Sequence, residues 1–207
     1  MTDVPAPSRD NILTRLAQPA VLVIAIWAIQ VLDAILPGSF SVLGIRSWSL
    51  TGSFGILAAP LLHASWAHLI SNTWPLLVMG GIASLDGVRR FWSVTLLAAI
   101  VSGVGAWVFN APGTLTIGAS GVVFGYFGYL LARAFVAPSL GRGIVYAIVA
   151  VVVAIAYGGV MLTGIFGAAQ GVSWQAHLFG AVGGALAAWI LRPRRAQAPG
   201  GRPGRRP

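Results

Sequence analysis

Residues 118–137 read GASGVVFGYFGYLLARAFVA, and this stretch decides how the chain folds. Apart from Ser120 near its start and Arg133 near its end, the stretch consists of small, apolar and aromatic residues, and it has roughly the 20 residues that a transmembrane helix needs. Glycines recur every three or four residues at Gly121, Gly125 and Gly128, so they share one helix face. Small-residue stripes let transmembrane backbones approach closely, which predicts a membrane helix packed tightly against another.

The rest of the chain is also strongly apolar. Its 207 residues are 57% hydrophobic and 8% charged, with a mean hydropathy of +0.84, whereas soluble chains carry about 25% charged residues. We expect an all-α polytopic membrane protein, with an N-terminal arm over residues 1–18, a membrane domain over 19–191 and a disordered basic tail over 192–207. The six predicted transmembrane helices cover residues 19–36, 67–85, 91–109, 119–137, 143–166 and 173–191.

The composition excludes several kinds of chemistry. The sequence has no cysteine, all of its basic residues other than histidine are arginine, and all of its acids are aspartate. It therefore has no thiol nucleophile and no disulfide. It also lacks the lysine of a phosphate-binding P-loop and the glutamate of a His-Glu-x-x-His zinc motif. We expect neither a metal nor any other cofactor.

The arginines indicate the orientation in the membrane. Twelve of the thirteen fall in the N-terminal arm, in the connections after the second and fourth predicted helices, or in the tail, and only Arg46 falls on the other side. Positively charged loops tend to stay cytoplasmic, so we expect both termini in the cytoplasm. The all-arginine, alanine- and glycine-rich usage is typical of a GC-rich bacterial genome, so we expect the protein in a bacterial plasma membrane. The tail is expected to lie near anionic lipid headgroups, and no nucleic-acid partner is expected.

Four polar side chains from three predicted helices lie at a similar depth, near the extracytoplasmic side. His68 and Asn72 are one turn apart on the second helix, Ser120 begins the fourth, and His177 lies in the first turns of the sixth. Taken singly, each has a structural explanation, as a helix cap or as a hydrogen bond between helices. Their common level favours a functional site, because ionisable groups in a membrane are costly.

A second glycine stripe indicates which helices meet. Gly180 and Gly184 form a Gly-x-x-x-Gly motif on the sixth predicted helix, matching the stripe that includes Gly125 on the fourth. We expect these two helices to pack together. Because Ser120 and His177 each precede the stripe of their own helix, this contact would place them side by side.

Three segments resemble motifs of the rhomboid intramembrane serine proteases. HASWAHLISN at residues 63–72 is similar to the family's second-helix pattern, GASG at 118–121 to its Gly-x-Ser-Gly, and AHLFGAVGG at 176–184 to the motif of its last core helix. The six-helix layout, the cytoplasmic termini and the long first loop agree with the family. The resemblance covers about residues 19–191.

The resemblance implies a Ser-His dyad that cleaves peptide bonds in or near transmembrane segments of membrane-protein substrates. Ser120 would be the nucleophile, and His177 would be the general base that activates its weakly nucleophilic hydroxyl. His68, Asn72 and the backbone N–H of Ser120 would form the oxyanion hole. The supporting positions that follow from the motifs are His63, Gly118, Gly121 and Phe124.

The first loop departs from the family pattern. Many rhomboids carry Trp-Arg where this chain has Phe54-Gly55, so we expect a different hydrogen-bond network in this loop. The apolar stretch over residues 54–62 is too short to span a bilayer, and we expect it to be interfacial or re-entrant.

Other functions have weaker support. The main alternative is a rhomboid-like protein that binds or traffics membrane proteins without catalysis, followed by a transporter or a histidine-ligated cofactor protein. An aspartyl protease is disfavoured because Asp33 and Asp86 lack a Gly-x-Gly-Asp context. We expect Asp86, Arg89 and Arg90 in a solvated loop, and Arg133 to extend its charge to the interface.

Overall fold

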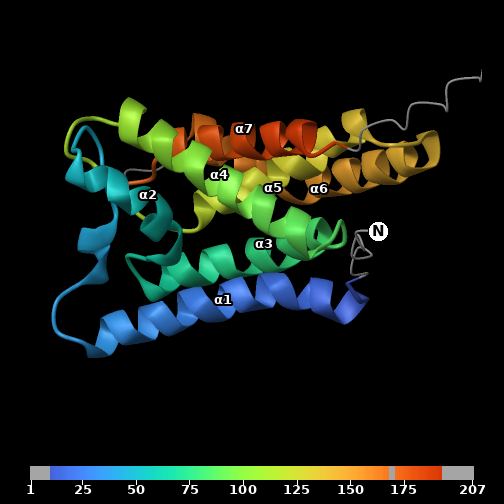
Figure 1. The fold of residues 1–207 in the computed structure, drawn as a ribbon. Helices are drawn as coiled ribbons and strands as arrows, with labels where there is room; N and C mark the ends of the chain where they lie inside the picture. The colour runs from blue at the N-terminus through green and yellow to red at the C-terminus, as the bar shows by residue number, and fades with distance from the viewer. Residues whose placement is uncertain (1–9, 168–170, 193–207) are drawn as a thin grey trace, which may run out of the picture.

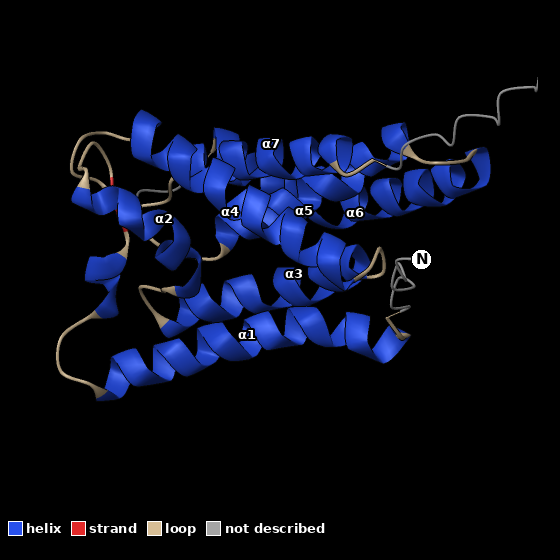
Figure 2. Ribbon diagram, viewed as in Figure 1, coloured by secondary structure: helices blue, strands red, loops and turns tan. Residues whose placement is uncertain are grey.

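The computed structural model describes residues 10–167 and 171–192, so half of the predicted arm and nearly all of the predicted tail lie outside the described residues. Within that range the chain is helical apart from one short strand pair, as Figure 2 shows. The six long helices are α1 (Ile12–Ile35), α3 (Trp66–Ser84), α4 (Val88–Phe109), α5 (Ser120–Ala132), α6 (Leu140–Phe166) and α7 (Trp174–Ile190). The shorter elements are η1 (Phe40–Leu43), β1 (Ile45–Arg46), η2 (Thr51–Phe54), α2 (Gly55–Ala58), η3 (Ala59–Leu61), β2 (Leu115–Thr116) and η4 (Arg133–Val136).

The protein is a polytopic all-α membrane protein, and each of the six predicted segments corresponds to one long helix. By length and composition α1, α4 and α6 can each cross a membrane. Helix α3 meets the same criterion together with the short helices before it, from which it is bent by 69°. Helices α5 and α7 are apolar but shorter, with 13 and 17 residues.

The first helix begins earlier than the sequence indicated. The predicted start was Pro19, but the helix begins at Ile12, where the Asn11 side chain accepts a hydrogen bond from the Thr14 N–H at 2.7 Å. Residues 12–18 therefore form the first turns of α1. Pro19 is buried within the helix and lies against Gly80 of α3. A proline inside a membrane helix is tolerated where a neighbouring helix packs against it.

Helix α5 occupies the centre of the bundle (Figure 1). It contacts α3, α4, α6 and α7, and nine of its thirteen residues are buried. Thirteen residues rise about 20 Å, which is less than the roughly 30 Å hydrocarbon core of a bilayer. The expected helix over 119–137 gives way to η4 after Ala132, because the chain turns there to bury Arg133 and Pro138 then favours an extended Ala137.

The glycine stripes bring α5 and α7 into backbone contact. A Cβ atom at Gly184 would overlap the carbonyl oxygen of Gly125, and one at Gly180 would overlap that of Gly121. A Cβ atom at Gly128 would likewise overlap the carbonyl of Ala181. Only residues without a side chain permit this separation, so the two helix axes are fixed at close range.

The first loop is folded as short helices against the end of α4. A Cβ atom at Gly55 would overlap the Gly44 backbone, while Phe54 is 83% exposed. The Ser47 hydroxyl donates to the Ala106 carbonyl at 3.0 Å, and the Trp107 indole N–H donates to the Ser49 carbonyl at 2.9 Å. Phe54-Gly55 therefore stands in a loop that is held by close backbone contacts and by bonds to α4.

Asp86 is not the solvated loop residue that the sequence indicated. Its carboxylate accepts hydrogen bonds from the Tyr129 hydroxyl at 2.6 Å and the Tyr146 hydroxyl at 3.1 Å, and forms an ion pair with Arg133 at 3.0 Å. The Arg133 side chain is 6% exposed, and its guanidinium lies over the Tyr146 ring. The expectation that Arg133 extends to the interface is therefore wrong, because a carboxylate and two phenols within reach satisfy its charge inside the bundle.

We predict that the Asp86–Arg133 pair contributes strongly to stability. Removing one partner of a buried ion pair leaves the other charge unpaired, so Asp86→Asn should lower the free energy of unfolding by about 3–5 kcal/mol. Denaturant titration in detergent micelles measures this. Arg142→Gln, which changes an exposed arginine, should have little effect. The double variant Asp86→Asn/Arg133→Gln should lose less than the sum of the two single variants, and additive losses would contradict the coupling.

Candidate active site

A cavity of about 850 Å³ opens beside the start of α5. Helices α3, α4, α5 and α7 contribute to its wall, together with the first loop and the connection before α5. Its lining is rich in small and polar groups, which suits a water-filled space. All four polar residues that the sequence placed at one level line this cavity: His68, Asn72, Ser120 and His177. Its other polar lining includes His63, Ser71, Asn110, Thr114 and Thr116.

The chain before Ser120 is held in position from several sides. The β1–β2 pair fixes residues 115 and 116, and the Gly118 N–H donates to the Ala59 carbonyl at 2.8 Å. Gly118 has φ +119°, a conformation that residues with side chains rarely adopt. The Ala119 N–H donates to Nε2 of His63 at 3.4 Å. Burial, together with the neighbouring His68 ring, lowers the pKa of His63 to about 4, so its ring is neutral and can accept this bond.

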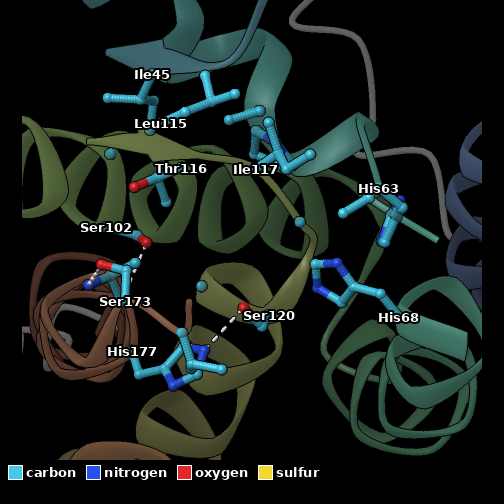
Figure 3. A pocket seen from close by; sticks show the side chains of 18 of the residues that line it. Ile45, His63, His68, Ser102, Leu115, Thr116, Ile117, Ser120, Ser173 and His177 are labelled. Atoms are coloured by element: carbon cyan, nitrogen blue, oxygen red, sulfur yellow. Dashed lines mark hydrogen bonds between the residues drawn. The ribbon is translucent and has the colours of Figure 1, made fainter. Parts of the chain in front are cut away.

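Ser120 and His177 lie in direct hydrogen-bond contact, with Oγ 2.8 Å from Nε2, as Figure 3 shows. Nδ1 of His177 lies 2.9 Å from the carbonyl oxygen of Gly164 on α6. A carbonyl oxygen can only accept, so Nδ1 carries the proton. In the neutral ring Nε2 is then unprotonated, and it must accept from the Ser120 hydroxyl.

The imidazole of His177 is also held by an aromatic ring. Phe124, one turn after Ser120, stacks on it with ring centroids 4.1 Å apart and planes 7° apart. Both side chains are buried, at 4% and 7% exposure. Ser120 is half-buried and remains open to the cavity.

The other polar residues lie on the opposite side of Ser120. Figure 3 shows His68 across from His177, with Ser120 between them. The Asn72 amide donates to the His68 carbonyl at 3.2 Å and lines the cavity. An amide nitrogen has two N–H donors, so one of them is not needed for this bond. The His63 and His68 rings meet edge to face, 5.0 Å apart.

Comparison with known proteins identifies the family. The family model for the Rhomboid domain matches residues 47–194, which is more than half of the chain. The chain belongs to the rhomboid family. It is 39% identical over 173 residues to uncharacterized protein Rv1337 of Mycobacterium tuberculosis, covering 80% of this chain and 70% of that protein.

Two other relatives cover similar shares of this rhomboid. Uncharacterized protein ML1171 of Mycobacterium leprae is 38% identical, over 80% of this chain and 67% of its own length. Rhomboid-like protein 11, chloroplastic, of Arabidopsis thaliana is 28% identical, over 73% of this chain and 59% of its own length.

Sequence reasoning missed two groups that shape the site of this rhomboid. One is the Gly164 carbonyl, which carries no side-chain signal. The other is Ser102 on α4, whose hydroxyl donates to the Ala176 carbonyl at 2.8 Å beside Gly121. A Cβ atom at Gly121 would overlap the Ser102 hydroxyl, so this glycine makes room for the contact between α4 and α7.

We predict that Gly118 is required both by its backbone conformation and by the ring that faces it. A Cβ atom there would lie 2.6 Å from Cε1 and 2.7 Å from Nε2 of His68. Gly113 also has a positive φ, +79°, but its Cβ would meet nothing within 4 Å. Gly113→Ala should therefore cost about 1 kcal/mol of stability from strain alone, and Gly118→Ala at least about 1 kcal/mol more. Equal losses in denaturant titrations would contradict this assignment.

Proposed function

We propose that this rhomboid is an intramembrane serine endopeptidase that uses Ser120 and His177 as a catalytic dyad. The observation that carries the proposal is the orientation of the His177 ring. Its Nδ1 proton is bonded to the Gly164 carbonyl, and its basic Nε2 lies 2.8 Å from the Ser120 hydroxyl. A general base within this distance is what converts a serine hydroxyl into a nucleophile.

The reaction follows from these two side chains. Ser120 Oγ attacks the scissile carbonyl carbon while its proton passes to Nε2 of His177. The tetrahedral intermediate collapses when the imidazolium returns that proton to the leaving amine, which leaves an acyl group on Ser120. Water from the cavity then attacks the acyl group, again with His177 as base, and the carboxylic acid product and the free serine are released.

The negative oxygen of the intermediate requires hydrogen-bond donors. Ser120 is the first residue of α5, so its backbone N–H has no acceptor within the helix and lies at the positive end of the helix dipole. The His68 ring and the unused N–H of Asn72 face the same cavity. We assign these three groups to the oxyanion hole.

The location of the site in the membrane is part of the proposal. The Arg15 guanidinium donates to the Leu85 carbonyl at 2.8 Å, and Arg90 contacts the Leu191 carbonyl, so these arginines gather at one end of the bundle. Arg46 lies on β1, next to Ile45, which lines the cavity. Because arginine-rich ends tend to stay cytoplasmic, we propose that the cavity lies on the extracytoplasmic side of a bacterial plasma membrane. The substrates are then membrane proteins with a transmembrane segment near the cut.

We predict that Ser120→Ala abolishes cleavage. Purified protein in proteoliposomes should cut a tagged transmembrane substrate, and the variant should not, because no other side chain carries the nucleophilic oxygen at this position. Ser71→Ala is the matched control, since Ser71 lines the same cavity but its hydroxyl bonds the His68 carbonyl at 2.8 Å. Two results would overturn the proposal. The first is cleavage by Ser120→Ala. The second is a wild type that cuts no transmembrane substrate and whose Ser120 is not labelled by a fluorophosphonate. The second result would instead favour a non-catalytic binding protein.

We predict that His68→Ala reduces kcat about 10²–10³-fold, the usual cost of removing one oxyanion donor. Fluorophosphonate labelling of Ser120 should also slow, because its phosphoryl oxygen occupies the same hole. The comparison is with His63→Ala: His63 bonds the Ala119 backbone outside the hole, so its main effect should be lower thermal stability. A larger kcat loss for His63→Ala than for His68→Ala would contradict the assignment of His68.

A further inference from the structure

The end of α6 provides an acceptor for His177. The last carbonyls of a helix have no donor in their own helix. Helix α6 ends at Phe166, and the Gly167 N–H closes the turn by bonding the Thr163 carbonyl at 2.9 Å. The next carbonyl, that of Gly164, accepts the Nδ1 proton of His177 at 2.9 Å. The bond therefore joins the last turn of one helix to the histidine of another.

The space around Gly164 admits no side chain. A Cβ atom at this position would lie 2.7 Å from Cζ of Phe124 and 3.1 Å from Nδ1 of His177, the two stacked rings of the site. Gly158 and Gly159 lie on the same helix, and a Cβ atom at either would meet nothing within 4 Å. The need for glycine is thus specific to the position that touches the dyad.

We propose that Gly164 is a positioning residue of the dyad, an inference that rests on the proposed function. Its backbone carbonyl takes the place that an acidic side chain has in a triad. It holds the Nδ1–H tautomer, aims Nε2 at Ser120, and stabilises the imidazolium that forms when His177 takes the serine proton. Both ring nitrogens of His177 are then occupied, one by Gly164 and one by Ser120.

Because the carbonyl belongs to α6, the alignment of the dyad depends on how this helix is packed. Of its 27 residues only Val153 and Met161 are buried, so α6 is held by few contacts. Met161 lies in the same apolar cluster as Phe124, about one turn before Gly164. The docking of this last part of α6 therefore keeps His177 in its reactive orientation.

The test compares Gly164→Ala with Gly159→Ala, which makes the same change on the same helix in open space. Two rates are measured for each folded variant: kcat and KM with a transmembrane substrate, and the rate at which a small fluorophosphonate labels Ser120. A misalignment of about 1 Å can cost 10²-fold in rate. Gly164→Ala should therefore lower both kcat and the labelling rate roughly 10- to 100-fold with KM nearly unchanged, while Gly159→Ala should match the wild type.

The small probe separates positioning from substrate docking. If Gly164→Ala changes only KM and is labelled like the wild type, Gly164 does not position the dyad and the inference is overturned, while the proposed function stands. If wild-type Ser120 is not labelled at all, the proposed function itself fails.

A measurement on the wild type keeps the inference testable if Gly164→Ala does not fold. In protein labelled with ¹⁵N-histidine, the His177 signals are identified by their loss in His177→Gln. They should show a protonated Nδ1 and an unprotonated Nε2 at neutral pH. The opposite tautomer would overturn the inference, because the Gly164 carbonyl cannot bond an unprotonated Nδ1.

Discussion

The contact between α5 and α7 sets the relative position of Ser120 and His177, the two side chains of the proposed dyad. Ser120 and His177 belong to different helices, and a hydrogen bond of 2.8 Å between them tolerates little change in the separation of those helices. The backbone contact of Gly184 with the Gly125 carbonyl fixes that separation, because no side chain lies between the two helices there. The hydrogen bond between Ser120 and His177 thus depends on a packing contact that is made by backbone atoms alone. A single methyl group at this contact would widen the distance between Ser120 Oγ and His177 Nε2.

A carbonyl in place of a carboxylate suits a site inside a membrane. A buried carboxylate beside His177 would need compensation for the loss of its hydration, which is costly in a low-dielectric environment. The Gly164 carbonyl lies in the last turn of α6, and its bond to His177 satisfies two polar groups without adding a charge. Where the chain does bury a carboxylate, at Asp86, an arginine and two tyrosines surround it.

The sequence predicted those parts of the molecule that depend on local pattern. Apolar length gave six helices, and the glycine stripes indicated that the helices carrying Ser120 and His177 would meet. The start of α1 was predicted less accurately. Asn11 caps a helix that begins at Ile12, and Pro19, the predicted start, is accommodated inside the helix because Gly80 of α3 packs against it. The environment of Asp86 could not be predicted, since its partners come from three elements distant in sequence. The role of Gly164 was hidden for another reason, because the group that acts is a backbone carbonyl common to every residue.

Two hydrogen bonds that the sequence did not indicate join α6 to the rest of the bundle, one near each end of the helix. Near its start Tyr146 bonds Asp86, and near its end Gly164 bonds His177, while the surface between them is largely exposed. The exposed apolar side chains of α6 can contact lipid in many orientations of the helix. Lipid contact alone therefore does not fix the position of α6. Hydrogen bonds are directional and short-ranged, and they supply the fixed points that apolar contact does not. The orientation of α6, and with it that of the His177 ring, therefore rests on these two polar contacts together with the apolar contacts of Val153 and Met161.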